Sequence, residues 1–379
     1  MIFHFRLLIA LRVAAAISGS ISLAGGPHDS PTTIFPKALA PGDTIEFVAP
    51  AKYLEKERVD VAKQRLEALG FKVRLPENLY RKKGFLGGTD EQRAAELMQA
   101  FADPDVDAIF PGTGGYGTTR IIDKLDYDVI RKNPKILIGF SDITGLHIAI
   151  NQQTGLVTFH SPNPEFGLGS DDDLLPYTAH WFWRAILATN KFPALLGRGQ
   201  GSAQHDADTI GYTIFTHLTK NSNLDEKLFT DVPHPVTLHG GKARGRLIGG
   251  NLSVMHAMMG SPYEIQTAGK ILFIEDVGEA PYRVDRMLNT LRLAGKFDHV
   301  AGIILGQFSA RQEEPKWDDD ESIDDVLGDY FGKLNVPVVT HFPLGHVRYN
   351  TTLPVGAMAE LDGDAQTVRL LEDPVSLRQ

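Results

Sequence analysis

Ser141 stands where an apolar strand, expected over 135–140, runs directly into a helix expected over 141–151. The local pattern alone favours an ordinary helix N-cap, with Asp142 favourable in the first turn. The same geometry also exposes a serine at the carboxyl edge of a parallel sheet, where open α/β folds bind ligands. The backbone N–H of Asp142 would then face an oxyanion. The usual nucleophile elbow reads G-x-S-x-G, whereas Ile143 takes the last position here, so both interpretations stay open.

Two further segments carry groups that could complete a catalytic site. Glu275 and Asp276 end an apolar strand, and chemistry alone does not choose between two adjacent carboxylates. His346 lies in an expected loop, in a chain that has 13 histidines. The alternative histidines that the sequence leaves open are His147, His160 and His256.

Residues 112–117 read G-T-G-G-Y-G and satisfy the spacing G-x-G-x-x-G of dinucleotide-binding folds. A dinucleotide site also needs an acidic residue about 20 positions further on, and it needs the motif on the first strand of the unit. Here the motif follows the third expected strand, and Asp126 and Asp128 come too early. The sequence therefore argues against a nucleotide site and predicts a loop whose backbone N–H groups can approach a ligand closely.

The composition excludes several classes of protein. The chain has 379 residues, with 38 Lys and Arg against 47 Asp and Glu, so its formal net charge at pH 7 is −9. Because no basic excess is present to follow a phosphate backbone, a nucleic-acid partner is not expected. Cysteine is absent, which rules out disulfides, thiolate zinc sites and a thiol nucleophile. A hydrolase of this composition depends on Ser, Thr, a carboxylate or a metal-bound water.

Alternating strands and helices predict a parallel α/β domain over residues 43–194, with helices on both faces of its sheet. The elements expected there are strands at 44–49, 71–75, 107–110 and 135–140, and helices at 55–69, 89–101, 118–125 and 141–151. A smaller mixed α/β or barrel-like domain is expected over 241–379, because strands outnumber helices there. Its expected elements are strands at 270–274, 300–305, 336–340 and 366–371, and a helix at 282–293. Residues 195–240 are interpreted as the interdomain connection.

The first 24 residues differ from the rest of the chain. Residues 7–17 form an apolar stretch after Arg6, and Ser22-Leu23-Ala24 places small residues at both key positions of a cleavage site. Arg12 interrupts the stretch, which is too short for a membrane span. We therefore expect a signal peptide over 1–24, a leader over 25–42 and a periplasmic or exported protein without stable membrane insertion. A cytoplasmic protein is the alternative.

Several short segments occur together, in the same order, in the LD-carboxypeptidase family of serine peptidases. The sequence resembles this family over about residues 43–371. The family also includes enzymes that hydrolyse microcin C-type aminoacyl-nucleotides. The matching segments are Gly114-Gly115-Tyr116-Gly117 with Arg120, residues 139–144, 158–162, 249–252, 275–276, 282–288, 306–308 and 344–346.

The resemblance implies a flavodoxin-like N-terminal domain, related to class I amidotransferases, and a smaller barrel-like C-terminal domain. It also implies that Ser141 is the nucleophile, Glu275 the acid and His346 the base, which settles the choices left open above. His346 would take the proton of Ser141, while Glu275 holds the imidazole. The family resemblance implies hydrolysis of murein tetrapeptides through an acyl-enzyme, between the L-centre of a diamino acid and the terminal D-Ala. No metal or other cofactor is implied.

Further residues are expected to contact the substrate. The N–H of Asp142 and one N–H from Gly114-Gly115 would hold the oxyanion. A carboxypeptidase must also bind a free carboxylate, which a bidentate Arg suits. The candidates for substrate binding are Arg120, Asn251, Arg283, Arg286 and Arg348.

Two departures from the family pattern keep the substrate open. Thr113 stands where the tetrapeptide enzymes often carry Arg, and the segment 195–239 looks long. The alternative enzyme is a hydrolase of aminoacyl- or peptidyl-nucleotide amides. A non-catalytic muropeptide-binding protein is a third hypothesis, against which the intact triad residues argue. A homodimer is compatible with the resemblance.

Overall fold

The computed structural model describes residues 31–170, 174–187, 213–215, 232–309 and 322–377. The expected signal peptide, the first part of the leader and most of the expected connection lie outside these ranges. Within these ranges, no helix is long and apolar enough to cross a bilayer.

The first sheet has six strands in the order β12-β5-β4-β3-β1-β2. Its parallel strands are β1 (Thr44–Val48), β2 (Lys72–Arg74), β3 (Ala108–Pro111), β4 (Ile136–Gly139) and β5 (Thr158–His160). Every residue of β3, β4 and β5 is buried, as is typical of a parallel sheet covered on both faces. The predicted parallel α/β architecture is therefore confirmed. One strand is an exception, because β12 (Leu353–Val355) comes from the far end of the chain and pairs antiparallel with β5.

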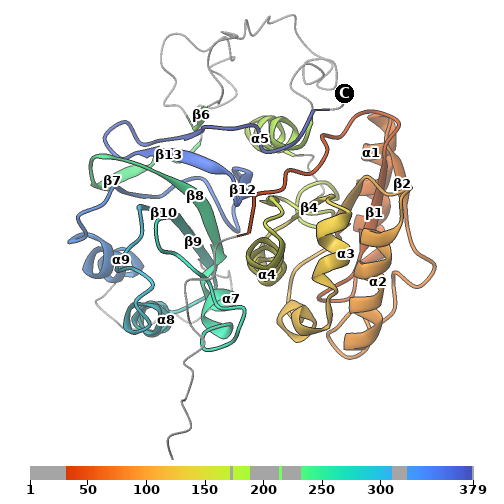
Figure 1. Ribbon diagram of the computed structural model, residues 1–379, viewed down its shortest axis with the longest axis horizontal. Helices are drawn as coiled ribbons and strands as arrows, with labels where there is room; N and C mark the ends of the chain where they lie inside the picture. The colour runs from red at the N-terminus through yellow and green to blue at the C-terminus, as the bar shows by residue number, and fades with distance from the viewer. Residues whose placement is uncertain (1–30, 171–173, 188–212, 216–231, 310–321, 378–379) are drawn as a thin grey trace, which may run out of the picture. The chain divides into compact units, whose positions relative to one another are not determined.

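Five helices belong to the described part of the chain that forms the first sheet (Figure 1). They are α1 (Lys56–Ala68), α2 (Asp90–Ala102), α3 (Tyr127–Lys132), α4 (Thr144–Thr154) and α5 (Pro176–Ile186). Thr89 caps α2 in a reciprocal pair of hydrogen bonds with Gln92. The helix expected over 118–125 is wrong: two 3₁₀ turns, Thr118–Arg120 and Ile122–Lys124, occupy this segment. Thr118, the first residue of this segment, is hydrogen-bonded to Asp142, and these bonds compete with those of a regular helix.

The second sheet has eight strands in the order β6-β14-β13-β8-β9-β10-β11-β7. They are β6 (Thr213–Phe215), β7 (Val236–His239), β8 (Lys242–Asn251), β9 (Ile271–Val277), β10 (Gly302–Ser309), β11 (Val338–Thr340), β13 (Met358–Asp362) and β14 (Thr367–Leu370). The four strands from β8 to β11 are parallel and the others antiparallel, which confirms a mixed C-terminal sheet. The helices of this part are α7 (Leu252–Ala257), α8 (Pro281–Leu293) and α9 (Ile323–Phe331). Since β6 and β7 fall within residues 195–240, the expected connection contributes strands to this sheet.

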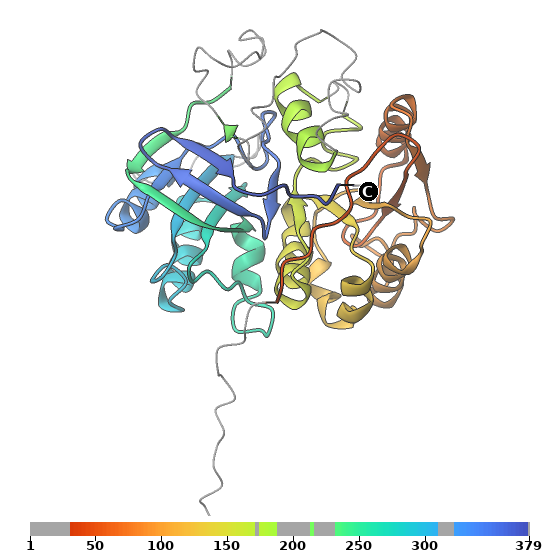
Figure 2. The same ribbon diagram turned by 45° about the horizontal axis from the view of Figure 1, so that its top comes forward.

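Segments from both ends of the described chain tie the two sheets together. Leu39, in the part expected to be a leader, is fully buried and bridges to Leu187, and Lys37 bridges to Ser376. The described part of that leader therefore belongs to the folded body. Figures 1 and 2 show α4 between the first sheet and the second. The buried apolar side chains of both sheets form one contiguous cluster.

Candidate active site

Ser141 occupies a strained turn between β4 and α4. Its φ is +62°, in the left-handed region that L-residues with side chains rarely adopt. A 3₁₀ turn over Ser141–Ile143 follows, and α4 begins only at Thr144 with Ile143 as its N-cap residue. The helix expected to begin at 141 therefore begins three residues later, and Ser141 is not its cap. Strain of this kind persists where the surrounding structure holds it, which points to a functional turn.

Asp142 fixes this turn to the glycine-rich loop. Its buried carboxylate accepts a hydrogen bond from the Thr118 backbone N–H at 2.8 Å, and the Thr118 hydroxyl donates to the Asp142 carbonyl at 2.6 Å. Burial raises the pKa of the Asp142 carboxyl, an effect that the bond from Thr118 opposes. The Asp142 side chain thus anchors the turn to Thr118, a role different from the favourable helix N-terminal charge that the sequence indicated.

His147 stabilises the residues on either side of this turn through two buried hydrogen bonds. Its Nε2 donates to the Gly139 carbonyl at 2.8 Å, and its Nδ1 accepts from the Thr158 hydroxyl at 2.9 Å. Burial lowers the pKa of His147 to about 4, so the ring is neutral near pH 7. His160, also fully buried, has its pKa lowered by the same cause. Neither histidine lines the pocket described below, nor does His256 on α7.

We predict that the free energy of unfolding falls as the pH falls from about 6.5 to 4. The folded pKa of His147 lies below its ordinary value of 6.5, so its contribution is present above pH 6.5 and is lost as the pH falls towards 4. A shift of this size corresponds to about 3 kcal/mol. Chemical denaturation at several pH values should give a flatter curve for His147→Gln than for the wild type. Parallel curves would contradict the prediction.

His346 is hydrogen-bonded to the buried Glu275. The His346 Nδ1 lies 2.7 Å from the Glu275 Oε2, and the Glu275 side chain is fully buried. Because a carboxylate only accepts, Nδ1 carries the proton and donates it, which leaves Nε2 as an acceptor. The ring of Phe140, the residue before Ser141, packs on the imidazole with centroids 4.8 Å apart. The imidazole is therefore in contact with the Glu275 carboxylate and with the ring of the residue before Ser141.

Different hydrogen-bond partners distinguish the adjacent acids Glu275 and Asp276. Asp276 accepts from the Ser253 N–H and hydroxyl at 2.9 and 2.7 Å, and from the Asn251 side chain at 3.0 Å. Burial and the nearby Glu275 raise the pKa of Asp276 to about 6.

A Cβ on Gly345, whose φ is +113°, would lie 2.7 Å from the Glu275 Oε2. Only glycine at this position lets the loop bring His346 onto Glu275.

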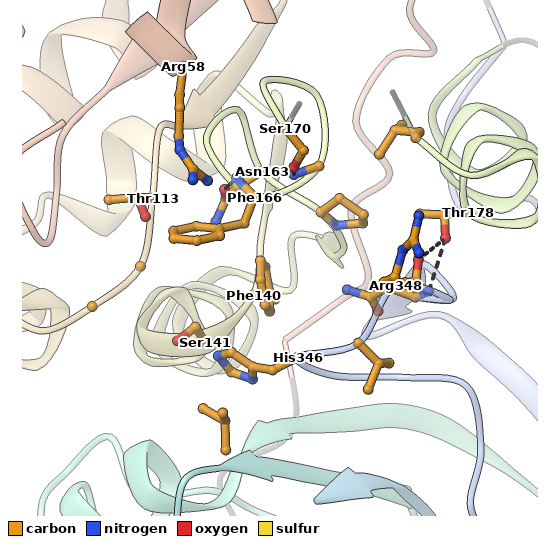
Figure 3. A pocket seen from close by; sticks show the side chains of 18 of the residues that line it. Arg58, Thr113, Phe140, Ser141, Asn163, Phe166, Ser170, Thr178, His346 and Arg348 are labelled. Atoms are coloured by element: carbon orange, nitrogen blue, oxygen red, sulfur yellow. Dashed lines mark hydrogen bonds between the residues drawn. The ribbon is translucent and has the colours of Figure 1, made fainter. Parts of the chain in front are cut away.

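Ser141 and His346 open into one pocket of about 690 Å³. Figure 3 shows Ser141 next to the imidazole of His346, with Phe140 near both. The lining includes Lys52, Arg58 and Arg348 but no carboxylate from the part of the chain that the structure describes. In the same described part, no three His, Asp or Glu side chains gather as a metal site would require. The pocket is thus suited to an anionic ligand.

The glycine-rich loop lies against Ser141. A Cβ on Gly114 would stand 2.8 Å from the Ser141 Cβ and 3.1 Å from the Asp142 backbone N. The Gly114 carbonyl accepts from the Lys52 N–H at 3.1 Å, which orients the peptide between Gly114 and Gly115. Of the residues expected to form the oxyanion hole, Gly114 therefore contacts Ser141, and Gly115 lines the same pocket.

Gly114→Ala is expected to lower kcat for the peptidase reaction by about 10²–10³-fold, the loss typical of one oxyanion donor. The added methyl cannot fit 2.8 Å from the Ser141 Cβ, so the loop must move away from the turn. Steady-state kinetics with a thermal melt would check this. Gly328→Ala is the matched control, because a Cβ at this helical glycine meets no atom within 4 Å. Equal activity of the two variants would show that the loop does not serve the reaction.

Of the five residues expected to bind substrate, Arg348 alone lines the pocket. Arg120 instead pairs with Asp90 through two nitrogens, at 2.9 and 3.1 Å. Asn251 caps α7 and donates to Asp276. The other two expected residues, Arg283 and Arg286, pack on the ring of Tyr282.

Sequence reasoning missed Lys52 and Arg58 as pocket residues. Lys52 follows the carboxyl end of β1, and Arg58 lies in the first turn of α1. The carboxyl edge of a parallel sheet is where such folds bind ligands. A basic residue soon after the first strand was therefore a usable signal.

Comparison with known proteins places both halves of the chain in one family. Residues 45–161 match the LD-carboxypeptidase N-terminal domain, and residues 244–361 match the LD-carboxypeptidase C-terminal domain. The probable murein peptide carboxypeptidase of Bacillus subtilis is 38% identical over 90% of this chain and 95% of its own. The murein tetrapeptide carboxypeptidase of Pseudomonas aeruginosa is 30% identical, over 84% and 93%. The microcin C7 self-immunity protein MccF of Escherichia coli is 29% identical, over 89% and 96%.

A solved structure agrees with these relatives. The crystal structure of an MccF-like protein from Bacillus anthracis superimposes with a TM-score of 0.73 at 27% identity, over 90% of this chain and all of the other. The fold and the relatives together define a serine-type carboxypeptidase. The chain belongs to the LD-carboxypeptidase family, and the resemblance drawn from its motifs is confirmed.

Proposed function

We propose that this protein hydrolyses murein tetrapeptides, releasing the terminal D-Ala from the L-centre of the preceding diamino acid. The observation that carries the proposal is the His346–Glu275 couple at 2.7 Å, opening into the same pocket as the strained Ser141. Its relatives include proteins described as murein peptide and murein tetrapeptide carboxypeptidases, which supports this substrate class.

Ser141 acts as the nucleophile in the proposed reaction. Nε2 of His346 takes the hydroxyl proton as the Ser141 oxygen attacks the carbonyl carbon of the cleaved bond. Glu275 holds the imidazole through Nδ1–H and stabilises the imidazolium that forms. The backbone N–H groups of Asp142 and of the Gly114 loop stabilise the oxyanion.

Collapse of this intermediate forms the acyl-enzyme. The C–N bond breaks, His346 gives its proton to the nitrogen of D-Ala, and the peptide remains as an ester on Ser141. A water molecule then attacks the ester, with His346 taking one proton of the water and returning it to the Ser141 oxygen. Both halves of the reaction use the same base and the same oxyanion donors.

The cations of the pocket serve the free carboxylates of the substrate. Arg348 contributes positive charge to the pocket wall. Lys52 and Arg58 add positive charge, part of which Glu55 offsets at 3.3 and 3.5 Å.

Direct measurement of D-Ala tests the proposal. Purified protein should release D-Ala from a disaccharide tetrapeptide, detected by mass spectrometry, and should leave the corresponding tripeptide unchanged. An aminoacyl-nucleotide amide is tested in parallel, because MccF of Escherichia coli is among the relatives. Cleavage of that amide without release of D-Ala would replace the proposal by the nucleotide-amide alternative. Turnover of neither would overturn both.

A further inference from the structure

An exposed aromatic pair lies beside the pocket and has no part in the mechanism above. It consists of Phe85 and Tyr116, whose side chains are 59% and 49% exposed. Their ring centroids are 5.7 Å apart and the rings are inclined by 60°. Large apolar groups that remain in water next to a binding pocket are a common mark of a recognition surface.

The aromatic pair is continuous with the pocket through Gly115 and Lys52, which both line it. Tyr116 directly follows Gly115, and a Cβ on Gly115 would lie 2.8 Å from the Lys52 Cβ. Lys52 also bridges to Leu86, the residue after Phe85. Tyr116 therefore directly follows a residue of the pocket wall, and the segment that carries Phe85 pairs with another, Lys52.

The segments next to the aromatic pair carry two lysines and a further aromatic ring, Tyr53. Lys82 Nζ stands 3.8 Å above the ring centre of Tyr53, and Lys52 Nζ lies 5.1 Å from the same centre. Such a surface offers ring faces for apolar C–H groups, and ammonium donors for hydroxyl, ether and amide oxygens. A pyranose ring with an acetamido group presents both kinds of partner.

The distance from the nucleophile suits the same ligand. A tetrapeptide places three residues before the cleaved bond, and these span at most about 11 Å when extended. Gly114 touches Ser141, and the Cα of Tyr116, two residues further along the chain, lies at most about 7 Å from that of Gly114. A sugar at the amino end of the peptide can therefore reach the aromatic pair while the cleaved bond lies at Ser141.

We propose that Phe85 and Tyr116 form a carbohydrate subsite, which binds the N-acetylated sugar attached to the peptide of a muropeptide substrate. The proposal rests on the proposed function and adds to it that the enzyme recognises the glycan as well as the peptide. Binding energy from this remote group is expected to favour glycosylated substrates over free peptides.

The test compares kcat/KM for D-Ala release from free tetrapeptide and from disaccharide tetrapeptide. The wild type should prefer the disaccharide substrate by about tenfold, as two ring contacts would supply. Phe85→Ala with Tyr116→Ala should remove this preference by raising KM for the disaccharide substrate alone. Tyr116→Phe should retain it, because the ring face remains. Leu293→Ala is the control, since Leu293 is exposed at the end of α8 and does not line the pocket.

Equal use of both substrates by the wild type would overturn the subsite while leaving the proposed function intact. A double variant that loses activity equally on both would also overturn it, because the aromatic pair would then only shape the loop. If the double variant loses turnover only of an aminoacyl-nucleotide amide, the aromatic pair stacks on a nucleobase, and the assignment of a sugar subsite is overturned. No D-Ala from either substrate would remove the proposed function itself, and the subsite with it.

Discussion

Ser141→Ala should lower kcat/KM for D-Ala release by about 10⁴–10⁶-fold, the range seen when a serine nucleophile is removed. The variant keeps the oxyanion donors and the cations of the pocket, so substrate should still bind. Alanine meets the same steric cost as serine at a φ of +62°, and thermal stability should therefore stay close to that of the wild type. Single-turnover assays with mass spectrometry would also show that no ester forms on the protein.

Ser170→Ala provides the matched control for this variant. Ser170 lines the same pocket, and its hydroxyl oxygen accepts a bond from the Gly167 N–H rather than facing His346. Its replacement should cost less than tenfold in kcat/KM. Residual D-Ala release by Ser141→Ala at a tenth of the wild-type rate would mean that another group attacks the peptide.

Glu275→Gln should lower kcat by about 10⁴-fold with little change in KM, by analogy with loss of the acid in other serine triads. The amide can present its N–H₂ group to Nδ1, which favours the tautomer with the proton on Nε2. That tautomer cannot accept the proton of Ser141. The neutral amide also no longer stabilises the imidazolium that forms during attack. Kinetics should be paired with a thermal melt, because Glu275 is fully buried.

A substitution of the neighbouring acid, Asp276, distinguishes an effect on catalysis from an effect on folding. Asp276→Asn removes a carboxylate that accepts bonds from Ser253 and Asn251 but does not touch His346. This variant should lose stability and change kcat less than tenfold. A loss of kcat as large as that of Glu275→Gln would reverse the assignment of the two acids.

Local patterns predicted the N-terminal half of the fold well. The strands and helices that alternate from β1 to α4 depend on apolar spacing and caps between near neighbours, which the sequence displays directly. The turn at Ser141 was anticipated as a junction, yet its left-handed backbone was not. That conformation is stabilised by Thr118 and His147, at bonds that no local pattern reveals.

The sequence indicated the catalytic candidates better than the substrate-binding residues, for the same reason. Local patterns left the choice of Ser141, Glu275 and His346 open, and the family resemblance assigned their roles. The structure brings Ser141 and His346 to one pocket and Glu275 against His346. The substrate-binding residues depend on which side chains converge in space. Arg120 looked suitable in the sequence, but Asp90 engages its guanidinium, whereas Lys52 and Arg58 reach the pocket from a different segment.

The strand β12 gives the enzyme a defined order of assembly during synthesis. β5 is complete at His160, but its antiparallel partner begins only at Leu353, 353 − 160 = 193 residues later. At translation rates of about 5–20 residues per second, this edge of the first sheet waits roughly 10–40 s for its partner. His346 emerges from the ribosome only shortly before β12. A nascent chain therefore carries Ser141 long before His346 is made, and synthesis of residues 346–355 both supplies His346 and closes the open sheet edge.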